Sequence, residues 1–182
     1  MFINGELDRA RELMQHNIEA VKALGVKKVV FTCPSCYYFW KRSYPAALGE
    51  EGLLEIQHAT EFLADLLEAQ KLPLREIPQT VTYHDPCDLG RKGGVVEAPR
   101  RVLAQIPGLR LVEMAENRDG AYCCGGGGNL ETYAPEMSKE VAGSRVQQAV
   151  DAGADMLVSA CQQCERTLAS AIRARRLRIR VK

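Results

Sequence analysis

Apolar residues recur at helical spacing in two stretches of the chain, and a glycine and a short apolar run follow each stretch directly. Gly25 ends the first stretch and Gly153 ends the second, in the position where glycine commonly terminates a helix. The apolar run after each glycine predicts a short strand. The helical positions are Leu13, Ile18, Val21 and Leu24 in the first stretch, and Met137, Val141, Val146 and Val150 in the second.

These two stretches belong to an internal repeat. Residues 23–36 align with residues 151–164 without a gap, so that the glycines and a C-x-x-C motif coincide in both copies. Another helical pattern follows each motif, over Tyr37–Tyr44 in one copy and Glu165–Ile172 in the other. The matched order of all these features predicts a duplicated structural unit.

The two copies are unequal in length. Residues 80–182 predict a complete repeat, residues 1–50 predict only the second half of one, and residues 51–79 predict a linker that contains a helix. The chain opens in the middle of a repeat, so we expect either the C-terminal piece of a longer protein or a short form that has lost one site. The complete copy is predicted to contain, in order, a strand Thr80–His84, a turn Asp85–Cys87, a helix Val95–Ile106, a strand Arg110–Met114 and a Cys-Cys-Gly loop. The linker is predicted to contain a helix Thr60–Gln70 and a connector with Pro73 and Pro78.

Strands that alternate with helices predict an α/β fold, in which helices flank a parallel sheet. In such folds, the loops at the carboxyl ends of the strands gather at one edge of the sheet. We expect the loops His84–Cys87 and Ser159–Cys164 to meet at that edge, joined by the loop that carries Cys123 and Cys124. The edge would then collect five thiols, from Cys87, Cys123, Cys124, Cys161 and Cys164.

The seven cysteines are more consistent with ligands or redox groups than with disulfides. Residues 1–9 contain no basic stretch followed by an apolar run, so no secretory signal is predicted, and no segment is apolar enough to span a bilayer. These features predict a cytoplasmic location, where stable disulfides are rare. The net charge of +1 gives no general attraction to nucleic acid or to anionic membranes. The basic C-terminal end is expected to be a solvated helix face and tail.

Five thiolates exceed the four ligands of a tetrahedral zinc ion, and adjacent cysteines converge poorly on one small ion. An iron–sulfur cluster accepts them, because each thiolate can bind a different iron. The glycine run 125–128 would let the backbone approach such a cluster and direct N–H groups at sulfur. Three alternatives stay open: structural zinc in the C-x-x-C motifs, a thioredoxin-like dithiol at Cys33 and Cys36, and a phosphate loop at 125–128 that lacks a following Lys-Ser/Thr.

The spacing of the five cysteines in the complete repeat resembles the cysteine-rich CCG domain, and segments 30–37 and 83–91 fit that domain as well. This domain occurs in the B and D subunits of heterodisulfide reductases. It also occurs in the iron–sulfur subunits of glycolate oxidase, lactate utilisation and anaerobic glycerol-3-phosphate dehydrogenase systems. The resemblance covers nearly the whole chain. It implies a noncubane 4Fe–4S cluster, which in heterodisulfide reductase acts on a disulfide, bound here by Cys87, Cys123, Cys124, Cys161 and Cys164.

The first repeat departs from the family pattern, because it lacks both the lone cysteine and the Cys-Cys-Gly motif. Only Cys33 and Cys36 remain, and we expect this incomplete site to hold no cluster by itself, since two thiolates are too few. The chain also lacks a ferredoxin-type cysteine run. Electrons would therefore arrive from a partner, either a ferredoxin-type subunit or a flavoprotein.

The resemblance implies an iron–sulfur electron-transfer or catalytic subunit of a cytoplasmic oxidoreductase, either free in the cytoplasm or peripheral to a membrane complex. Such a subunit would reduce a disulfide or couple to a flavin-dependent hydroxy-acid dehydrogenase. It would need companion subunits and a small-molecule substrate, and it would not be active alone. The alternative from another class is a non-enzymatic zinc-binding scaffold.

Other residues carry weaker expectations. His84 is a candidate donor of a proton or hydrogen bond beside the cluster, although a histidine at a strand end is more often a packed core residue. Arg91 would offset cluster charge, bind a carboxylate or simply be solvated. His16 and His58 are expected on helices, as surface or core residues. The aromatic run 37–40 is expected to pack between the repeats.

Overall fold

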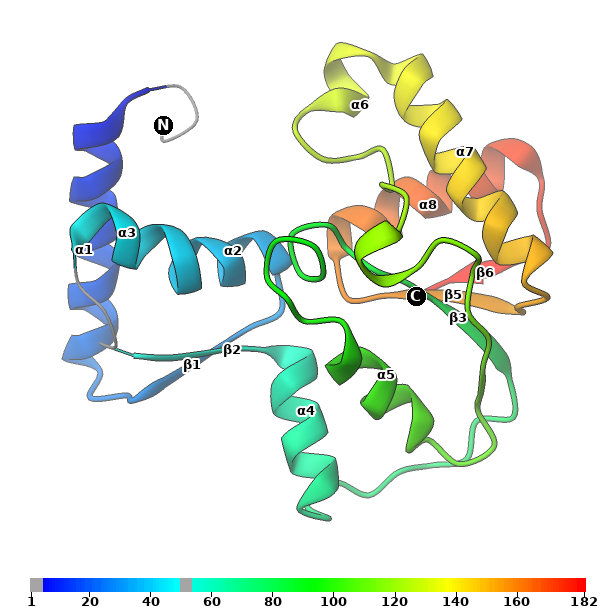
Figure 1. Ribbon diagram of the computed structural model, residues 1–182, viewed down its shortest axis with the longest axis horizontal. Coiled ribbons are helices and arrows are strands. Elements are labelled where there is room, and N and C mark those ends of the chain that lie inside the picture. The colour runs from blue at the N-terminus through cyan, green and yellow to red at the C-terminus, as the bar shows by residue number, and fades with distance from the viewer. Residues whose placement is uncertain (1–4, 50–53) are drawn as a thin grey trace.

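The computed structural model describes residues 5–49 and 54–182 (Figure 1). The N-terminal part contains, in order, α1 (Leu7–Ala23), β1 (Lys28–Phe31), α2 (Pro34–Tyr38), the π-helical segment η2 (Phe39–Ser43), α3 (Tyr44–Leu48), β2 (Glu55–His58) and α4 (Ala59–Glu68). The C-terminal part contains β3 (Thr80–His84), α5 (Glu97–Ala104), β4 (Arg110–Leu111), the 3-10 turn η3 (Arg118–Gly120), α6 (Leu130–Tyr133), α7 (Pro135–Asp151), β5 (Met156–Ser159), α8 (Gln162–Arg175) and β6 (Arg180–Val181).

The strands form two parallel sheets, and this confirms the predicted α/β class. One sheet has the order β1-β2 and the other has the order β4-β3-β5-β6. Helices α7 and α8 lie on one side of the four-stranded sheet and α5 lies on the other (Figure 1). Within the sheet, β3 and β5 pair in parallel, and His84 and Ser159 are register partners. The carboxyl ends of these two strands therefore lie side by side.

The structure reproduces the order of elements that the internal repeat predicted. A 17-residue helix, a four-residue strand and a helix starting within the C-x-x-C motif occur as α1, β1 and α2, and again as α7, β5 and α8. Gly25 and Gly153 follow the two long helices with φ of +69° and +73°, a conformation that residues with a side chain rarely adopt. The boundaries drawn between the partial repeat, the linker and the complete repeat stay a prediction.

Two strands were missed by the sequence patterns. The segment predicted as a linker with one helix also contains β2, whose residues Glu55–His58 include a single aliphatic residue and gain their order by pairing with β1. The basic C-terminal end, expected to be a solvated tail, places Arg180 and Val181 in β6 against β5, and it buries Ile179. Both strands depend on hydrogen bonds to a neighbour, which no local pattern records.

The ends of several predicted elements were also wrong. The strand predicted over Arg110–Met114 pairs only through Arg110 and Leu111, because the chain then leaves the sheet to reach the cysteine loop. The helix predicted over Val95–Ile106 is shorter, and the helix predicted over Tyr37–Tyr44 extends from Pro34 to Leu48 with a π-helical segment in the middle.

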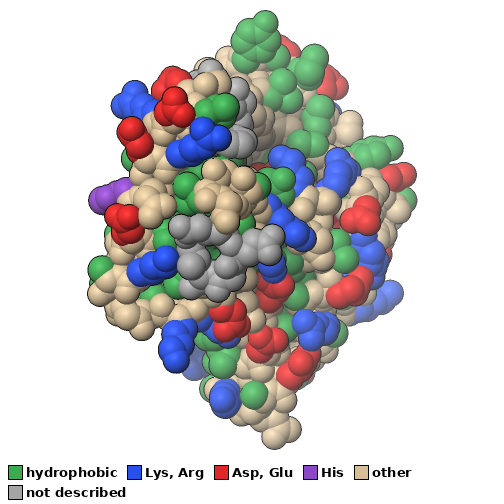
Figure 2. Space-filling view, turned by 60° about the vertical axis from the view of Figure 1, so that its left-hand side comes forward, with side chains coloured by type: hydrophobic (Ala, Val, Ile, Leu, Met, Phe, Trp, Pro, Cys, Tyr) green, Lys and Arg blue, Asp and Glu red, His purple; other side chains and the backbone are tan. Residues whose placement is uncertain are grey.

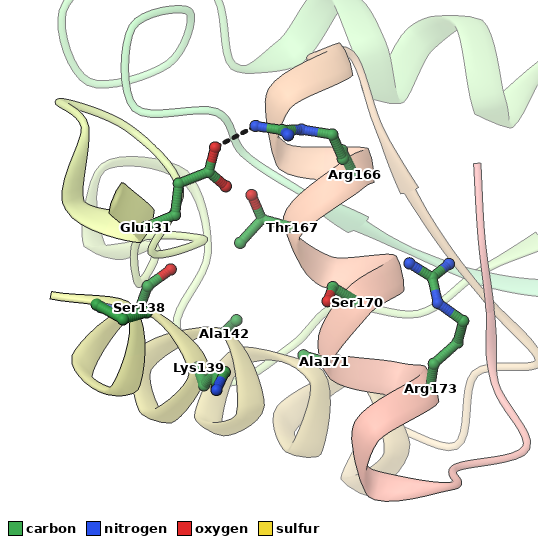
Figure 3. A pocket seen from close by; sticks show the side chains of 10 residues that line it. Glu131, Ser138, Lys139, Ala142, Arg166, Thr167, Ser170, Ala171 and Arg173 are labelled. Atoms are coloured by element: carbon green, nitrogen blue, oxygen red, sulfur yellow. Dashed lines mark hydrogen bonds and ion pairs between the residues drawn. The ribbon is translucent and has the colours of Figure 1, made fainter. Parts of the chain in front are cut away.

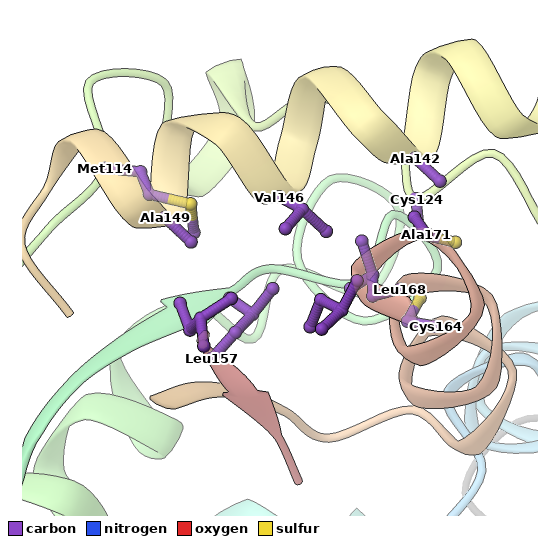
Figure 4. Close-up of a cluster of buried hydrophobic side chains, with 11 residues drawn as sticks. Met114, Cys124, Ala142, Val146, Ala149, Leu157, Cys164, Leu168 and Ala171 are labelled. Carbon is purple, nitrogen blue, oxygen red and sulfur yellow. The ribbon is translucent and has the colours of Figure 1, made fainter. Parts of the chain in front are cut away.

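Two apolar clusters hold the layers together. The larger lies between α7, α8 and the four-stranded sheet (Figure 4), and it includes Val146, Leu157 and Leu168, none of which is exposed to solvent. Cys124 and Cys164 belong to this same cluster, so the core directly supports the cysteine site. The second cluster joins the two sheets. Tyr37 is fully buried there and packs with Leu89 and Ala160. The expectation that the aromatic run packs between the repeats holds for Tyr37, whereas Trp40 packs against Phe31 and Tyr44 within the N-terminal part.

Positive and negative side chains are interspersed on the face of the molecule shown in Figure 2, in keeping with the net charge of +1. Among the described residues, no helix is both long and apolar enough to cross a membrane.

The expectation that His58 lies on a helix is wrong. His58 lies at the end of β2, where it caps α4. Its Nδ1 atom accepts a hydrogen bond from the Thr60 backbone N–H at 3.3 Å, and its own backbone N–H donates to Glu61 Oε2 at 2.9 Å. The side chain is buried, and this burial lowers the pKa of His58.

We expect this histidine to make the protein less stable in mild acid. Because its folded-state pKa lies below the ordinary value of 6.5, the folded state binds fewer protons than the unfolded state as the pH falls below that value. The stabilisation present above that pH is then lost. Urea unfolding of the reduced, iron-free protein at neutral and mildly acidic pH should show a larger loss for the wild type than for His58→Asn, since asparagine also caps helices. Equal losses would contradict this role.

Candidate metal centre

The three cysteine-bearing loops start from adjacent places at one edge of the four-stranded sheet. The turn with Cys87 follows β3, and Cys161 follows β5, its neighbour in the sheet. The loop with Cys123 and Cys124 follows β4 and the turn η3. Parallel pairing places these three loops at the same end of the strands, where ligands gather in open α/β sheets.

The structure brings together all five thiols of the complete repeat. Thiol–thiol hydrogen bonds connect Cys87 to Cys123, Cys123 to Cys124, Cys124 to Cys164, and Cys164 to Cys161. Cys124 and Cys164 are buried, whereas Cys123 is exposed. The site therefore extends from the apolar core to the surface, and the prediction that these loops converge is confirmed.

Contact between the thiols changes their acidity. Hydrogen bonds from Cys124 and Cys87 lower the pKa of Cys123, and a hydrogen bond from Cys164 lowers the pKa of Cys161 to about 6. The corresponding bonds raise the pKa values of Cys87 and Cys164, their donors. Thiols packed this closely cannot all ionise without a compensating positive charge, and a bound metal centre supplies such a charge.

The start of α8 also favours the ionised form of Cys161. This residue is the N-cap of the helix, and the backbone N–H groups of Gln163 and Cys164 further lower its pKa. The sequence predicted this effect from a helix that begins just after Cys161.

The glycine loop holds the vicinal cysteines through its backbone. The N–H groups of Gly125 and Gly126 donate to the sulfurs of Cys123 and Cys124, each at 3.4 Å. The carbonyl of Gly125 accepts a hydrogen bond from Ser138 Oγ at 2.7 Å, which ties the loop to α7. The expectation that the glycine run directs N–H groups at sulfur is confirmed.

His84 lies against the buried end of the thiol cluster. A ring nitrogen of His84 and the sulfurs of Cys124 and Cys164 lie within 4.8 Å of one another, and all three residues are buried. Its Nδ1 atom accepts a hydrogen bond from Arg145 Nε at 3.0 Å. Burial, followed by the positive charge of Arg145, lowers the pKa of His84 to about 3, so the imidazole is neutral.

A network of charges, buried at Arg100 and Asp85, holds the turn before Cys87. Arg100 donates to both carboxylate oxygens of Asp85, at 2.7 and 2.9 Å, and to both of Glu113, at 2.6 and 3.1 Å. Asp85 also accepts the Arg118 backbone N–H at 2.8 Å. The sequence patterns missed Arg100 and Arg145. The available signal was an arginine on the apolar stripe of a predicted helix, and both residues occupy such positions.

Arg91 has a structural role that the sequence did not predict. Its guanidinium donates to the carbonyls of Asp119 and Ala121, at 3.1 and 2.8 Å, and thereby fixes the segment that leads to Cys123. Arg91 is also exposed, in keeping with a solvated arginine, and its expected roles toward cluster charge or a carboxylate stay predictions.

Cys33 and Cys36 lie at the end of β1, in the place that corresponds to Cys161 and Cys164, and Cys36 is exposed. The Cys33 sulfur accepts the Cys36 backbone N–H at 3.5 Å. This loop contacts the five-cysteine site: Ser35 Oγ donates to Asp88 Oδ2 at 2.5 Å, and Gln162 Nε2 donates to the Thr32 carbonyl at 3.1 Å. The pair is therefore adjacent to the five-cysteine site.

Two cavities flank the cysteine loop. An open groove of about 530 Å³ reaches the exposed Cys123 and is lined mainly by apolar groups, including Tyr122 and Val141. A second pocket, of about 350 Å³, lies between α6, α7 and α8 (Figure 3), where Glu131 forms an ion pair with Arg166. None of the predicted cysteine ligands lines this second pocket, whereas the groove at Cys123 gives access to the thiol site.

The residues present fit an iron–sulfur cluster. The donor set is five thiols connected in one series of contacts, and two of them accept hydrogen bonds from glycine N–H groups. The buried Nε2 atom of His84 has no partner in the described part of the chain. Soft thiolates with backbone N–H donors are the typical environment of protein-bound clusters.

The cysteine-rich CCG domain family matches residues 1–41 and 81–169, which is more than half of the chain and includes all seven cysteines. The chain therefore belongs to this family. It is 47% identical, over 162 residues, to the D subunit of Dihydromethanophenazine:CoB--CoM heterodisulfide reductase from Methanosarcina acetivorans, a match that covers 88% of this chain and 40% of that protein.

Two other relatives are also named as redox proteins. The chain is 36% identical to the probable iron-sulfur-binding oxidoreductase FadF of Bacillus subtilis, covering 94% of this chain and 24% of that protein. It is 32% identical to the B subunit of fumarate reductase (CoM/CoB) from Methanothermobacter marburgensis, covering 91% and 32%. The chain thus spans between about a quarter and two fifths of the length of these relatives, which are oxidoreductases or their subunits.

Proposed function

We propose that Cys87, Cys123, Cys124, Cys161 and Cys164 bind one 4Fe–4S cluster, and that the chain is an iron–sulfur electron-transfer part of an oxidoreductase. The contact among the five thiols carries this proposal. When bound, the cluster would supply one-electron transfer. Five thiolates are one more than four irons need, and this surplus favours the noncubane form over a regular cubane.

The location of the site favours a small substrate that approaches from the groove at Cys123. By analogy with the heterodisulfide reductase relative, we propose a disulfide as the substrate. The resemblance to the CCG domain of glycolate oxidase and lactate utilisation systems gives the alternative, coupling to a flavin-dependent hydroxy-acid dehydrogenase. Reduction of a disulfide to two thiols consumes two electrons and two protons. The electrons would come from a ferredoxin-type or flavoprotein subunit, and we place this assembly in the cytoplasm, either free or peripheral to a membrane complex.

Anaerobic purification with analysis of iron and sulfide tests the proposal. We expect about four irons per chain, a brown colour and an EPR signal that changes on reduction. About eight irons would contradict the expectation that Cys33 and Cys36 hold no cluster of their own. A colourless protein with one zinc per chain would favour the scaffold alternative, which the close contact of His84, Cys124 and Cys164 supports, because zinc accepts nitrogen and sulfur ligands.

Cys124→Ser should remove or alter the cluster, because the Cys124 thiol is hydrogen-bonded to both Cys123 and Cys164 in the middle of the thiol series. Cys36→Ser is the matched control, since Cys36 is exposed and lies outside that series. Iron content and the visible spectrum of the two variants should differ clearly. If Cys124→Ser retained the wild-type iron content and spectrum, the vicinal pair would not have the role assigned to it.

A further inference from the structure

Arg145 is a fully buried arginine that no cysteine pattern identified. It projects from α7, and its Nη1 atom donates to the Glu116 carbonyl at 2.6 Å and to Gln148 Oε1 at 2.7 Å. Its Nη2 atom is buried without a partner among the described residues. Within residues 5–49 and 54–182, no carboxylate lies at ion-pair distance from this guanidinium.

This arrangement differs from that of the other buried arginine beside the site. Arg100 is neutralised by Asp85 and Glu113, as expected for a structural ion pair. Arg145 instead donates to neutral acceptors, and the carboxylates of Asp85, Glu116 and Glu113 offset its buried positive charge only from beyond ion-pair distance. The thiols of Cys124 and Cys164, on the other side of His84, would add further negative charge at this place when they bind a metal.

The hydrogen bond from Arg145 also determines the tautomer of His84. A guanidinium has only donors, so the Nδ1 atom that receives its Nε–H must be an acceptor and carry no proton. The proton of the neutral imidazole then lies on Nε2. The Nε2 atom is buried with no partner in the part of the chain that the structure describes. It belongs to the ring of which a nitrogen lies within 4.8 Å of the sulfurs of Cys124 and Cys164.

We propose that Arg145 is a positioning residue of the cysteine site: it fixes His84 as the Nε2–H tautomer, so that the ring beside the sulfurs of Cys124 and Cys164 keeps a free N–H donor for a bound cluster, and it adds a buried positive charge at this end of the site. The effect on a bound cluster rests on the proposed function. The Arg145–His84 relay needs only the protein, so the two ideas can fail separately. An N–H donor and a positive charge near cluster sulfur both favour the reduced, more negative state.

Nitrogen-15 NMR of the reduced, iron-free wild type tests the relay directly. We expect His84 to give the signals of a neutral ring protonated at Nε2. A ring protonated at Nδ1, or at both nitrogens at neutral pH, would overturn the proposal whatever the variants do. Arg145→Met should lose the single tautomer, and Arg145→Lys, which keeps a donor and the charge, should restore it in part.

Redox titration of the iron-loaded protein tests the second half. Arg145→Met should shift the reduction potential to more negative values, Arg145→Lys should reverse part of that shift, and the exposed control Arg101→Met should leave the potential unchanged. An Arg145→Met protein that keeps its iron and its wild-type potential would overturn the proposal. So would a spectrum showing His84 bound to iron. If His84 is the expected tautomer but neither the wild type nor any variant binds iron, the role of Arg145 toward His84 is supported and the proposed function is contradicted.

Discussion

Gly125→Ala is expected to abolish most of the iron binding and to lower the free energy of unfolding by about 2–4 kcal/mol, since overpacking and a strained backbone conformation each cost about 1–3 kcal/mol. A Cβ atom at this position would lie 2.6 Å from the Ser138 carbonyl, which is backbone of α7 and has little freedom to move. Gly125 also has φ of +82°, where side chains are disfavoured. Any shift of the loop that relieves this clash also moves the backbone N–H of residue 125, which donates to the Cys123 sulfur.

The same loop provides two matched controls. A Cβ atom on Gly127 meets nothing within 4 Å, and this glycine is not among those with positive φ, so Gly127→Ala should leave stability and iron content near wild type. Gly128 has equal space but φ of +61°, so Gly128→Ala measures the backbone strain alone, about 1 kcal/mol. Chemical denaturation and iron analysis of all three variants separate the effects. Equal behaviour of Gly125→Ala and Gly127→Ala would show that the close approach to α7 does not shape the site.

The sequence was sufficient to predict the convergence of the cysteines because parallel topology does the positioning. Once Cys87 and Cys161 are assigned to the ends of two strands in one parallel sheet, their proximity follows without knowledge of any side chain. The repeat was visible for a similar reason. Gly25 and Gly153 follow the ends of two helices in the same left-handed backbone conformation, and a local requirement of this kind can be recognised in the sequence because glycine meets it best.

What the sequence could not predict depends on partners distant along the chain. Arg100 and Arg145 each donate to a side chain distant along the chain, Glu113 at 13 positions and His84 at 61 positions. The strand β2 exists because of its pairing with β1. An arginine within an apolar helical stripe predicts burial, but it does not indicate which distant group would receive the hydrogen bonds.

Arg100→Met is expected to lower the free energy of unfolding by about 3–5 kcal/mol, the usual cost of removing one partner from a buried ion pair. The Arg100 side chain is 6% exposed and that of Asp85 is 1% exposed. Burial alone would lower the pKa of Arg100, yet its hydrogen bonds to Asp85 and Glu113 raise it. The variant would leave Asp85 charged and buried, one residue after His84 and two before Cys87.

Arg101→Met is the matched control, at the adjacent position of the same helix. Arg101 pairs with Glu68 at 2.5 Å, but both side chains are about half exposed, and such a surface pair contributes about 0–1 kcal/mol. Urea unfolding should therefore separate two identical substitutions by several-fold in their effect. A double variant, Arg100→Met with Asp85→Asn, should recover part of the loss, because it removes the unpaired charge. If Arg100→Met and Arg101→Met cost the same, the turn before Cys87 is held by packing alone, and the buried charges beside it do not stabilise the site.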